Sequence, residues 1–221
     1  PAISRIYGAM IAYLGDDNGL VLPFDLAPVQ IIIIPILFKE KEDVVLDKAK
    51  EIIERLNSKY TVKIDDSDES PGSKFYYWEL RGVPIRIEIG PRDLDKNQVV
   101  LVKRNDGAKF FVKDEELEKT IDDIANNYTK EIKEKSLVDF ESQIECVTDK
   151  NAAIEAINKG KIVCCGFCSI DFDGELCAGE VEKDIGAFVR GTRVDEEKNK
   201  FDNCLICGKT AGCTVYIAKS Y

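Results

Sequence analysis

Residues 29–38 read Val-Gln-Ile-Ile-Ile-Ile-Pro-Ile-Leu-Phe, and residues 30–37 of this segment are the most apolar run of the chain. A strand with one face in water alternates apolar and polar residues, whereas a strand buried on both faces is apolar almost throughout. The segment therefore predicts an internal strand of a sheet. No apolar run of the sequence approaches the about 20 residues that a membrane-spanning helix needs, so we expect no membrane partner.

Helix and strand patterns alternate after this segment. Apolar residues recur at three- and four-residue steps in amphipathic helices, and at every second position in strands with one exposed face. The expected elements are a helix over 43–56, a strand over 60–64, a loop over 65–73, a helix over 74–80, a half-exposed strand over 83–89 and a hairpin of 98–103 and 109–112. This order predicts an α/β layer with a mixed sheet flanked by helices.

The two ends of the chain have different patterns. Apolar residues at helical spacing over 3–14 predict a helix with a buried face, ended by a turn at 15–19. Residues 115–135 predict a long acidic helix, and residues 138–158 predict more helix. Residues 161–221 are poor in aliphatic side chains and rich in Cys and Gly. We expect them to form a small α+β domain that needs a metal ion to fold.

The charge of the chain is unevenly distributed. Its formal net charge is −10, which at first argues against a nucleic-acid partner. Residues 74–113, however, contain nine Lys and Arg against five Asp and Glu, a balance of +4. Residues 114–160 contain six against thirteen, a balance of −7. A local basic surface can bind RNA whatever the sign of the total, so the net charge neither excludes nor supports tRNA.

Seven of the eight cysteines lie between residues 164 and 213, and there is no histidine. The absence of histidine excludes Ser-His-Asp and Cys-His catalysis and leaves thiolates or carboxylates as metal ligands. Two pairs have metal-ligand spacing, Cys165-Gly-Phe-Cys168 and Cys204-Leu-Ile-Cys207, and Cys177 lies between them. Four thiolates without an open position predict a structural zinc ion. The spacing alone does not decide which four cysteines bind.

Two other interpretations of the cysteines remain open at this point. Clustered cysteines without a readable secretory signal indicate a cytoplasmic metal site more than a disulfide network, but they could also be buried free thiols. Cys165-Gly-Phe-Cys168 also has the form of a thioredoxin-like redox pair. Such a pair should open a helix, whereas the residues that follow it, Ser169–Gly174, have loop composition.

Motifs along the whole chain resemble the prolyl-tRNA synthetases of the archaeal and eukaryotic type, which are class II synthetases. The matching segments are Ser4-Arg5, Gly15–Pro23, Ala27–Gln30, Ser70-Pro71-Gly72, Lys74-Phe75, Trp78–Pro84, Arg86–Asp93 and Ala218–Tyr221. The resemblance implies three parts. Residues 1–26 would be the motif 3 end of the catalytic domain, residues 27–135 the anticodon-binding domain and residues 136–221 a C-terminal zinc-binding domain.

The resemblance implies roles for six residues besides the metal ligands. Arg5 matches the motif 3 arginine that contacts the ATP phosphates, a task suited to the paired donors of a guanidinium group. The residues that match the family's anticodon readers are Glu79, Arg86, Arg92 and Asp93. Arginine donors and carboxylate acceptors suit an anticodon rich in guanine, although by composition alone these charges could be an exposed strand face with ion pairs. Tyr221 matches the terminal residue whose carboxylate approaches the active site; a frayed tail is the alternative.

For the metal, the resemblance implies the ligands Cys168, Cys177, Cys204 and Cys207, and it leaves Cys165 out, against the first interpretation from spacing. Three positions depart from the family pattern. Leu14 stands where a histidine is usual, Ser67 lies in a loop that usually contains an arginine, and Ser73 replaces an aromatic residue. Each departure removes a phosphate, stacking or packing contact.

The implied parent enzyme forms prolyl-adenylate from proline and ATP with Mg2+, transfers the prolyl group to tRNA(Pro), and is a homodimer in the cytoplasm. The chain begins at Pro1 rather than at a methionine, so we expect motifs 1 and 2 to lie upstream and the fragment alone to be inactive in aminoacylation. The alternatives are a freestanding, non-catalytic tRNA-binding or interaction protein and, less favoured, a thiol oxidoreductase.

Overall fold

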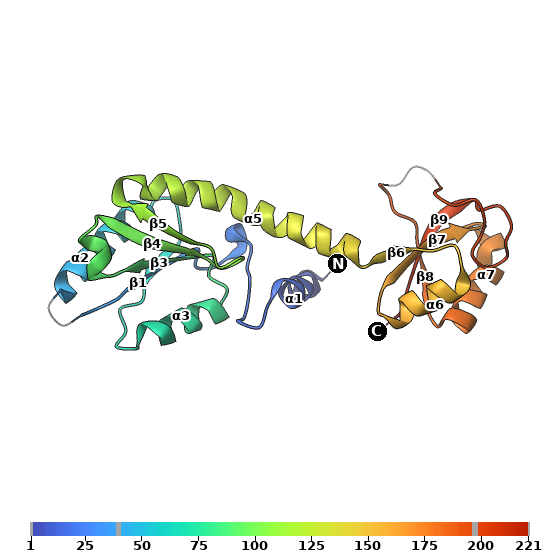
Figure 1. Cartoon of the computed structure of the whole chain (residues 1–221), viewed down its shortest axis with the longest axis horizontal. Coiled ribbons are helices and arrows are strands. Elements are labelled where there is room, and N and C mark those ends of the chain that lie inside the picture. Colours follow the sequence, from blue (N-terminus) through green and yellow to red (C-terminus); the bar gives the residue numbers. More distant parts are fainter. Residues whose placement is uncertain (1, 39–40, 196–198, 221) are drawn as a thin grey trace. The chain divides into compact units, whose positions relative to one another are not determined.

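The computed structural model describes residues 2–38, 41–195 and 199–220 (Figure 1). The chain divides into two compact units, Pro1–Ser136 and Leu137–Tyr221. Among the described residues, no helix combines the length and the apolar character needed to cross a membrane.

A five-stranded mixed sheet forms the centre of the first unit. Its strand order is β2-β1-β3-β4-β5, formed by β1 (Ile31–Pro35), β2 (Val62–Ile64), β3 (Ile85–Ile89), β4 (Gln98–Lys103) and β5 (Lys109–Lys113). The strands β2, β1 and β3 are parallel, whereas β3, β4 and β5 are antiparallel. The predicted α/β class with a mixed sheet is confirmed, and so are the isoleucine-rich internal strand and the hairpin.

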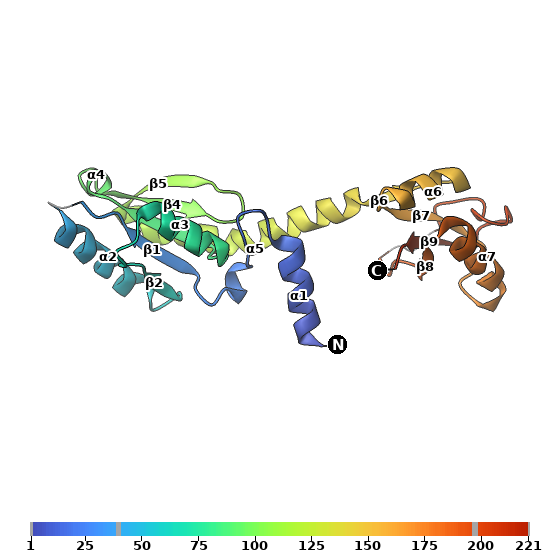
Figure 2. The ribbon, with the colours of Figure 1, turned by 90° about the horizontal axis from the view of Figure 1, so that it is seen from below.

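Helices cover both faces of this sheet (Figures 1 and 2). Alternate residues of β1 and β3, such as Ile33 and Ile87, pack with α2 (Glu42–Leu56) and the first part of α5 (Leu117–Ser142). On the other face, Ile32 and Ile34 pack with Phe75 and Trp78 of α3 (Pro71–Leu80). The helix α3 lies below the sheet in Figure 1, and the start of α5 lies above it.

The strand β3 differs from its prediction. We expected a half-exposed strand over 83–89, but all five residues of β3 are buried. The strand is internal in the sheet, between β1 and β4, and α3 covers the face that Arg86 and Glu88 occupy. The prediction of one face in water was therefore wrong, because the covering helix cannot be read from the alternation within the strand.

The helix α3 also begins earlier than predicted. Residues 65–73 were expected to form a loop, yet Pro71 is already the first residue of the helix. Proline suits this position because it needs no backbone N–H there. The Ser70 side chain accepts a hydrogen bond from the Ser73 N–H at 3.3 Å and caps the helix.

The first helix, α1 (Ile3–Leu14), is confirmed as a helix but not as a buried one. None of its residues is buried, and only Met10 and Leu14 are half-buried. The turn that follows is held firmly against α3. The Leu20 N–H donates to the carbonyl of Leu80 at 3.1 Å, and Gly19 has φ +128°, with its Cα so close that an added Cβ would lie 2.4 Å from the Leu80 Cα.

The second unit contains a four-stranded sheet in the order β6-β7-β9-β8. Its elements are β6 (Ile144–Cys146), α6 (Lys150–Asn158), β7 (Ile162–Phe167), α7 (Glu175–Glu180), β8 (Phe188–Gly191) and β9 (Cys213–Ala218). Val163, Phe167, Val215 and Ile217 form its core with residues of α6 and α7. The expected α+β character is present. The predicted helix over 138–158 was wrong, because α5 ends at Ser142 and β6 intervenes before α6.

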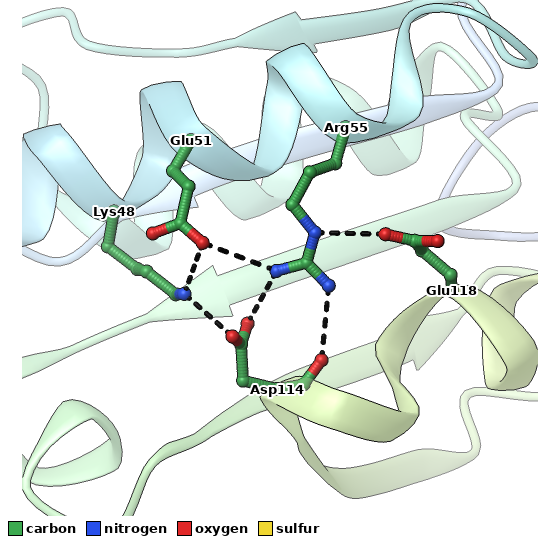
Figure 3. A network of polar contacts seen from close by, with 5 residues as sticks. All are labelled: Lys48, Glu51, Arg55, Asp114 and Glu118. Atoms are coloured by element: carbon green, nitrogen blue, oxygen red, sulfur yellow. Dashed lines mark hydrogen bonds and ion pairs between the residues drawn. The ribbon is translucent and has the colours of Figure 1, made fainter.

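A polar network joins α2 to the start of α5 (Figure 3). Asp114 accepts a hydrogen bond from Lys48 at 2.8 Å and one from Arg55 at 3.0 Å. Arg55 also pairs with Glu118 at 2.9 Å, and Lys48 with Glu51 at 2.8 Å. Burial acts to raise the pKa of Asp114, but the hydrogen bonds from Lys48 and Arg55 outweigh it and hold that pKa below its usual value.

Replacing Asp114 by asparagine is expected to lower the free energy of unfolding by about 1 kcal/mol at pH 7, because hydrogen bonds to charged groups are weakened. A carboxylate whose pKa is depressed by folding stabilises the protein above its unfolded pKa of about 3.9, and this stabilisation is lost as pH falls through the folded pKa. The difference between wild type and variant in denaturant unfolding should therefore shrink below about pH 4. A difference that persists unchanged in acid would contradict this role.

Candidate functional sites

Arg86 lies at the centre of a group of charges between β3 and α3. Its Nη1 donates to Oε1 of Glu79 on α3 at 2.7 Å, and its Nε donates to Oε1 of Glu88, two residues along β3, at 2.9 Å. We call Glu79, Arg86 and Glu88 the arginine network. Glu88 was not among the predicted site residues, although its position two residues from Arg86 places both on one face of a strand.

The surroundings of Arg86 are largely apolar. Its guanidinium carbon lies 4.2 Å from the ring centroid of Phe75, and Ile32 and Val102 are its neighbours on the adjacent strands. Only 7% of Arg86 is exposed. A buried cation is tolerated when its donors are hydrogen-bonded. Two nitrogens of Arg86, Nε and Nη1, donate to carboxylates. The third, Nη2, makes no hydrogen bond with any residue in the described part of the chain. The ion pairs expected from composition are present, but they are not on an exposed face.

Arg92 and Asp93 lie beyond the other end of β3, on the short helix α4 (Pro91–Leu94). Arg92 is exposed, and Asp93 is half-buried and accepts a weak hydrogen bond from Gln98 at 3.4 Å. At about 3.3 Å per residue, some 13 Å of extended chain separates Arg86 from Gly90. Within the described residues, no hydrogen bond or ion pair joins this second pair to the arginine network.

The structure places Arg5 near the start of the first helix. Arg5 is exposed on the first turn of α1, and its side chain has no hydrogen bond or ion pair to another described residue. Tyr221 lies outside the described residues. Two departures from the family pattern have local roles instead: Ser67 donates through N and Oγ to the Asp65 carboxylate, and the Ser73 N–H completes the cap of α3.

Two polar contacts between α3 and Asp65 were missed in the sequence. The indole Nε1 of Trp78 donates to Oδ2 of Asp65 at 2.6 Å, and the buried Lys74 ammonium donates to the Asp65 carbonyl at 3.0 Å. Asp65 directly follows β2, so these two contacts tie α3 to the edge of the sheet. The only signal in the sequence is the position of an aspartate at the end of a strand.

Four cysteines of the second unit lie around one point. The Sγ atoms of Cys168, Cys177, Cys204 and Cys207 are all within 4.8 Å of one another, and those of Cys168 and Cys177 are 3.6 Å apart. Tetrahedral zinc with Zn–S bonds of about 2.3 Å places its sulfurs about 3.8 Å apart. The group therefore has the donor chemistry and size for a metal with four soft ligands, and we call it the thiol cluster.

Local backbone structure positions the four cysteines of the thiol cluster. Cys168 follows β7, Cys177 lies on α7, and Cys204 and Cys207 belong to a tight turn. In that turn the Gly208 N–H donates to the Cys204 carbonyl at 3.1 Å, and Gly208 has φ +69°. The Lys209 N–H directed at the sulfur lowers the pKa of Cys207 to about 7, which favours the thiolate that a metal binds.

Cys165 is not part of the thiol cluster. It is fully buried in the core of the second unit, and burial raises the pKa of its thiol to about 12. It lies within β7, not at the start of a helix. A redox pair of Cys165 and Cys168 would need an accessible, acidic thiol at the former position, so the geometry does not support the oxidoreductase interpretation.

Comparison with known proteins gives both units a family. Residues 30–124 match the model described as anticodon binding domain, and residues 150–221 match the model described as prolyl-tRNA synthetase, C-terminal. A proline–tRNA ligase of Methanopyrus kandleri is 38% identical over 218 residues, which are 98% of this chain and 44% of that protein. One of Ruminiclostridium cellulolyticum is 40% identical over 221 residues, 99% of this chain and 44% of its own.

A solved structure agrees. The Giardia lamblia prolyl-tRNA synthetase in complex with prolyl-adenylate is 34% identical and has a TM-score of 0.91, covering 99% of this chain and 47% of that one. An anticodon-binding domain joined to such a C-terminal domain defines a part of an aminoacyl-tRNA synthetase. The chain belongs to the prolyl-tRNA synthetase family, of which it comprises the anticodon-binding and C-terminal parts. It spans less than half the length of these relatives.

Proposed function

We propose that this chain reads the anticodon of tRNA(Pro) on behalf of an enzyme that ligates proline to tRNA(Pro), using ATP and Mg2+ by way of prolyl-adenylate. The observation that carries the proposal is the arginine network, a fixed guanidinium group beside carboxylates in a domain that matches anticodon-binding domains. The similarity to proline–tRNA ligases along 98% of the chain supports the choice of proline. We place the enzyme in the cytoplasm and expect a homodimer when it is full length.

The two charged pairs suit guanine bases. Arg86 offers N–H donors to the O6 and N7 acceptors of guanine, and its Nη2 remains available. The Glu79 carboxylate, 35% exposed, can accept from a base N–H group. Arg92 and Asp93 repeat the same combination of donor and acceptor at the other end of β3. Splayed, single-stranded bases of a loop can reach both places.

The remaining assignments belong to the same proposal. Residues 1–26 would complete the catalytic domain, residues 27–135 bind the anticodon, and residues 136–221 form the zinc-binding domain. Arg5 would contact the ATP phosphates, and the Tyr221 carboxylate would approach the active site. Zinc in the thiol cluster would supply a structural crosslink between the end of β7, α7 and the turn at Cys204.

The chain alone should not activate proline. Incubation of the 221 residues with proline, ATP and labelled pyrophosphate is expected to give no proline-dependent exchange, whereas the longer protein should give it. The fragment should still bind tRNA(Pro), so tRNA binding and pyrophosphate exchange can be measured separately on one preparation. Robust exchange by the fragment would overturn the proposal that proline activation requires the longer protein.

Replacing Arg92 by alanine is expected to weaken tRNA(Pro) binding by about 1–3 kcal/mol, roughly 5- to 150-fold in Kd. Arg92 is exposed, so the melting temperature should not change. Filter binding or anisotropy with the cognate transcript measures the loss, and a transcript with an altered anticodon should bind both proteins equally.

Lys50→Ala is the matched control, because it removes an exposed positive charge from α2. This helix covers the face of the sheet opposite α3. It should leave the affinity nearly unchanged. If Arg92→Ala weakened binding to cognate and altered transcripts by the same factor, Arg92 would be a phosphate contact and not a base reader.

A further inference from the structure

Two cysteines outside the thiol cluster lie side by side in the second sheet. The strands β6 and β7 are neighbours (Figure 1). They pair in parallel, and Cys146 is the register partner of Cys164. Register partners on adjacent strands project from the same face. Neighbouring strands are about 4.7–4.9 Å apart, which lies within the Cα separation of about 4.4–6.8 Å that disulfides span. Neither cysteine forms a disulfide in this structure.

The thiols of Cys146 and Cys164 differ in their exposure to solvent. Cys146 is exposed, whereas Cys164 is fully buried beside it. Burial, followed by the neighbouring Cys146 side chain, raises the pKa of Cys164 to about 11. An exposed thiol meets an oxidant first, and a protected neighbour can then resolve the product. Alternation along β7 turns Cys164 away from the core that contains Cys165.

We propose that Cys146 and Cys164 are a peroxide-responsive thiol pair that closes to a disulfide between β6 and β7. The Cys146 sulfur attacks the O–O bond of hydrogen peroxide, giving a sulfenic acid and one water molecule. The Cys164 sulfur then attacks the sulfenic sulfur, the S–S bond forms, and a second water leaves. Two thiols are oxidised and one peroxide is reduced, and a small dithiol reverses the reaction.

The bond would change the second unit locally. The strand β6 is an edge strand of three residues, held to the sheet by β7 alone. A Cys146–Cys164 disulfide would close the loop that contains α6 and fix this edge covalently. None of the four residues of the thiol cluster takes part, so oxidation of this pair and metal binding should be independent.

The test uses the purified 221-residue chain, treated with one equivalent of hydrogen peroxide at neutral pH and mapped by non-reducing peptide mass spectrometry. The expected result is a peptide that links Cys146 to Cys164, lost on dithiothreitol, with the metal content unchanged. Absence of this peptide after oxidation, or disulfides confined to the thiol cluster together with metal release, would overturn the proposal.

Variants make the assignment specific. C146S removes an exposed thiol and should fold, and it should leave Cys164 reduced after peroxide. C164S should convert Cys146 to a sulfenic acid that dimedone traps, whereas wild type should trap little. C213S, which changes a half-buried cysteine outside both groups, should behave as wild type. Equal labelling of Cys146 by dimedone in wild type and C164S would show that Cys164 does not resolve it.

Discussion

Replacing Cys168 by alanine is expected to abolish stoichiometric zinc binding and to unfold much of residues 137–221 while residues 30–124 stay folded. Cys168 is one of four thiols that converge within 4.8 Å, and three ligands leave the ion bound far less tightly. Structural zinc contributes an apparent 10–16 kcal/mol in small zinc-dependent folds, which is as large as the total stability of a typical domain. Metal analysis and amide hydrogen exchange, resolved by segment, measure both effects.

Cys165→Ala is the matched comparison, because it removes a thiol only three residues away. Cys165 is buried in the core and outside the thiol cluster, so its loss should cost about 1 kcal/mol of stability with zinc retained. If Cys165→Ala lost the metal and Cys168→Ala kept it, the ligand set proposed here would be wrong and the interpretation from spacing alone would regain its support.

Replacing Arg86 by alanine is expected to lower both the stability of the first unit and its affinity for tRNA(Pro). The change leaves Glu79 and Glu88 without the cation that both contact, at 2.7 and 2.9 Å. Removing one partner of a buried ion pair costs about 3–5 kcal/mol, and the partial exposure of Glu79 favours the lower end. Loss of the base contact should weaken cognate tRNA binding by a further 1–3 kcal/mol, about 5- to 150-fold in Kd, and relax discrimination at one base.

A double variant separates these two effects. Arg86→Ala with Glu88→Gln removes one of the uncompensated carboxylates, so denaturant unfolding should show part of the stability restored. The affinity for tRNA(Pro) should stay low, because no guanidinium group returns. If the double variant bound tRNA(Pro) like wild type, Arg86 would support the fold only, and the anticodon would be read by other residues.

Local patterns predicted the elements that depend on their own residues. The isoleucine run of β1, the stripe of α2 and the hairpin of β4 and β5 all appear close to their expected places. The strand β6 was missed because three residues form a strand only through pairing with β7, a contact that no local pattern contains. The exposure of α1 and the burial of β3 were missed for the same reason, since each depends on what covers the element.

The candidate sites also depend on contacts between elements that local patterns do not contain. Cysteine spacing indicated a metal site without deciding its ligands, and the resemblance left Cys165 out. In the structure Cys165 lies in the core, whereas Cys168, just after β7, joins Cys177. The charges of Arg86 and Glu79 were recognised through the resemblance to the synthetase family. Their contact with each other depends on how α3 packs on the sheet, which the sequence does not state.

The fixed position of Arg86 has a thermodynamic consequence for recognition. A free arginine side chain carries about 2 kcal/mol of rotamer entropy, and at Arg86 the two carboxylates and Phe75 remove most of that freedom during folding. A base that meets this guanidinium group does not have to immobilise it, whereas the exposed Arg92 must become ordered on binding. The entropic cost of binding a base at Arg86 should therefore be smaller than at Arg92, which calorimetric binding entropies measured with singly altered anticodons would resolve.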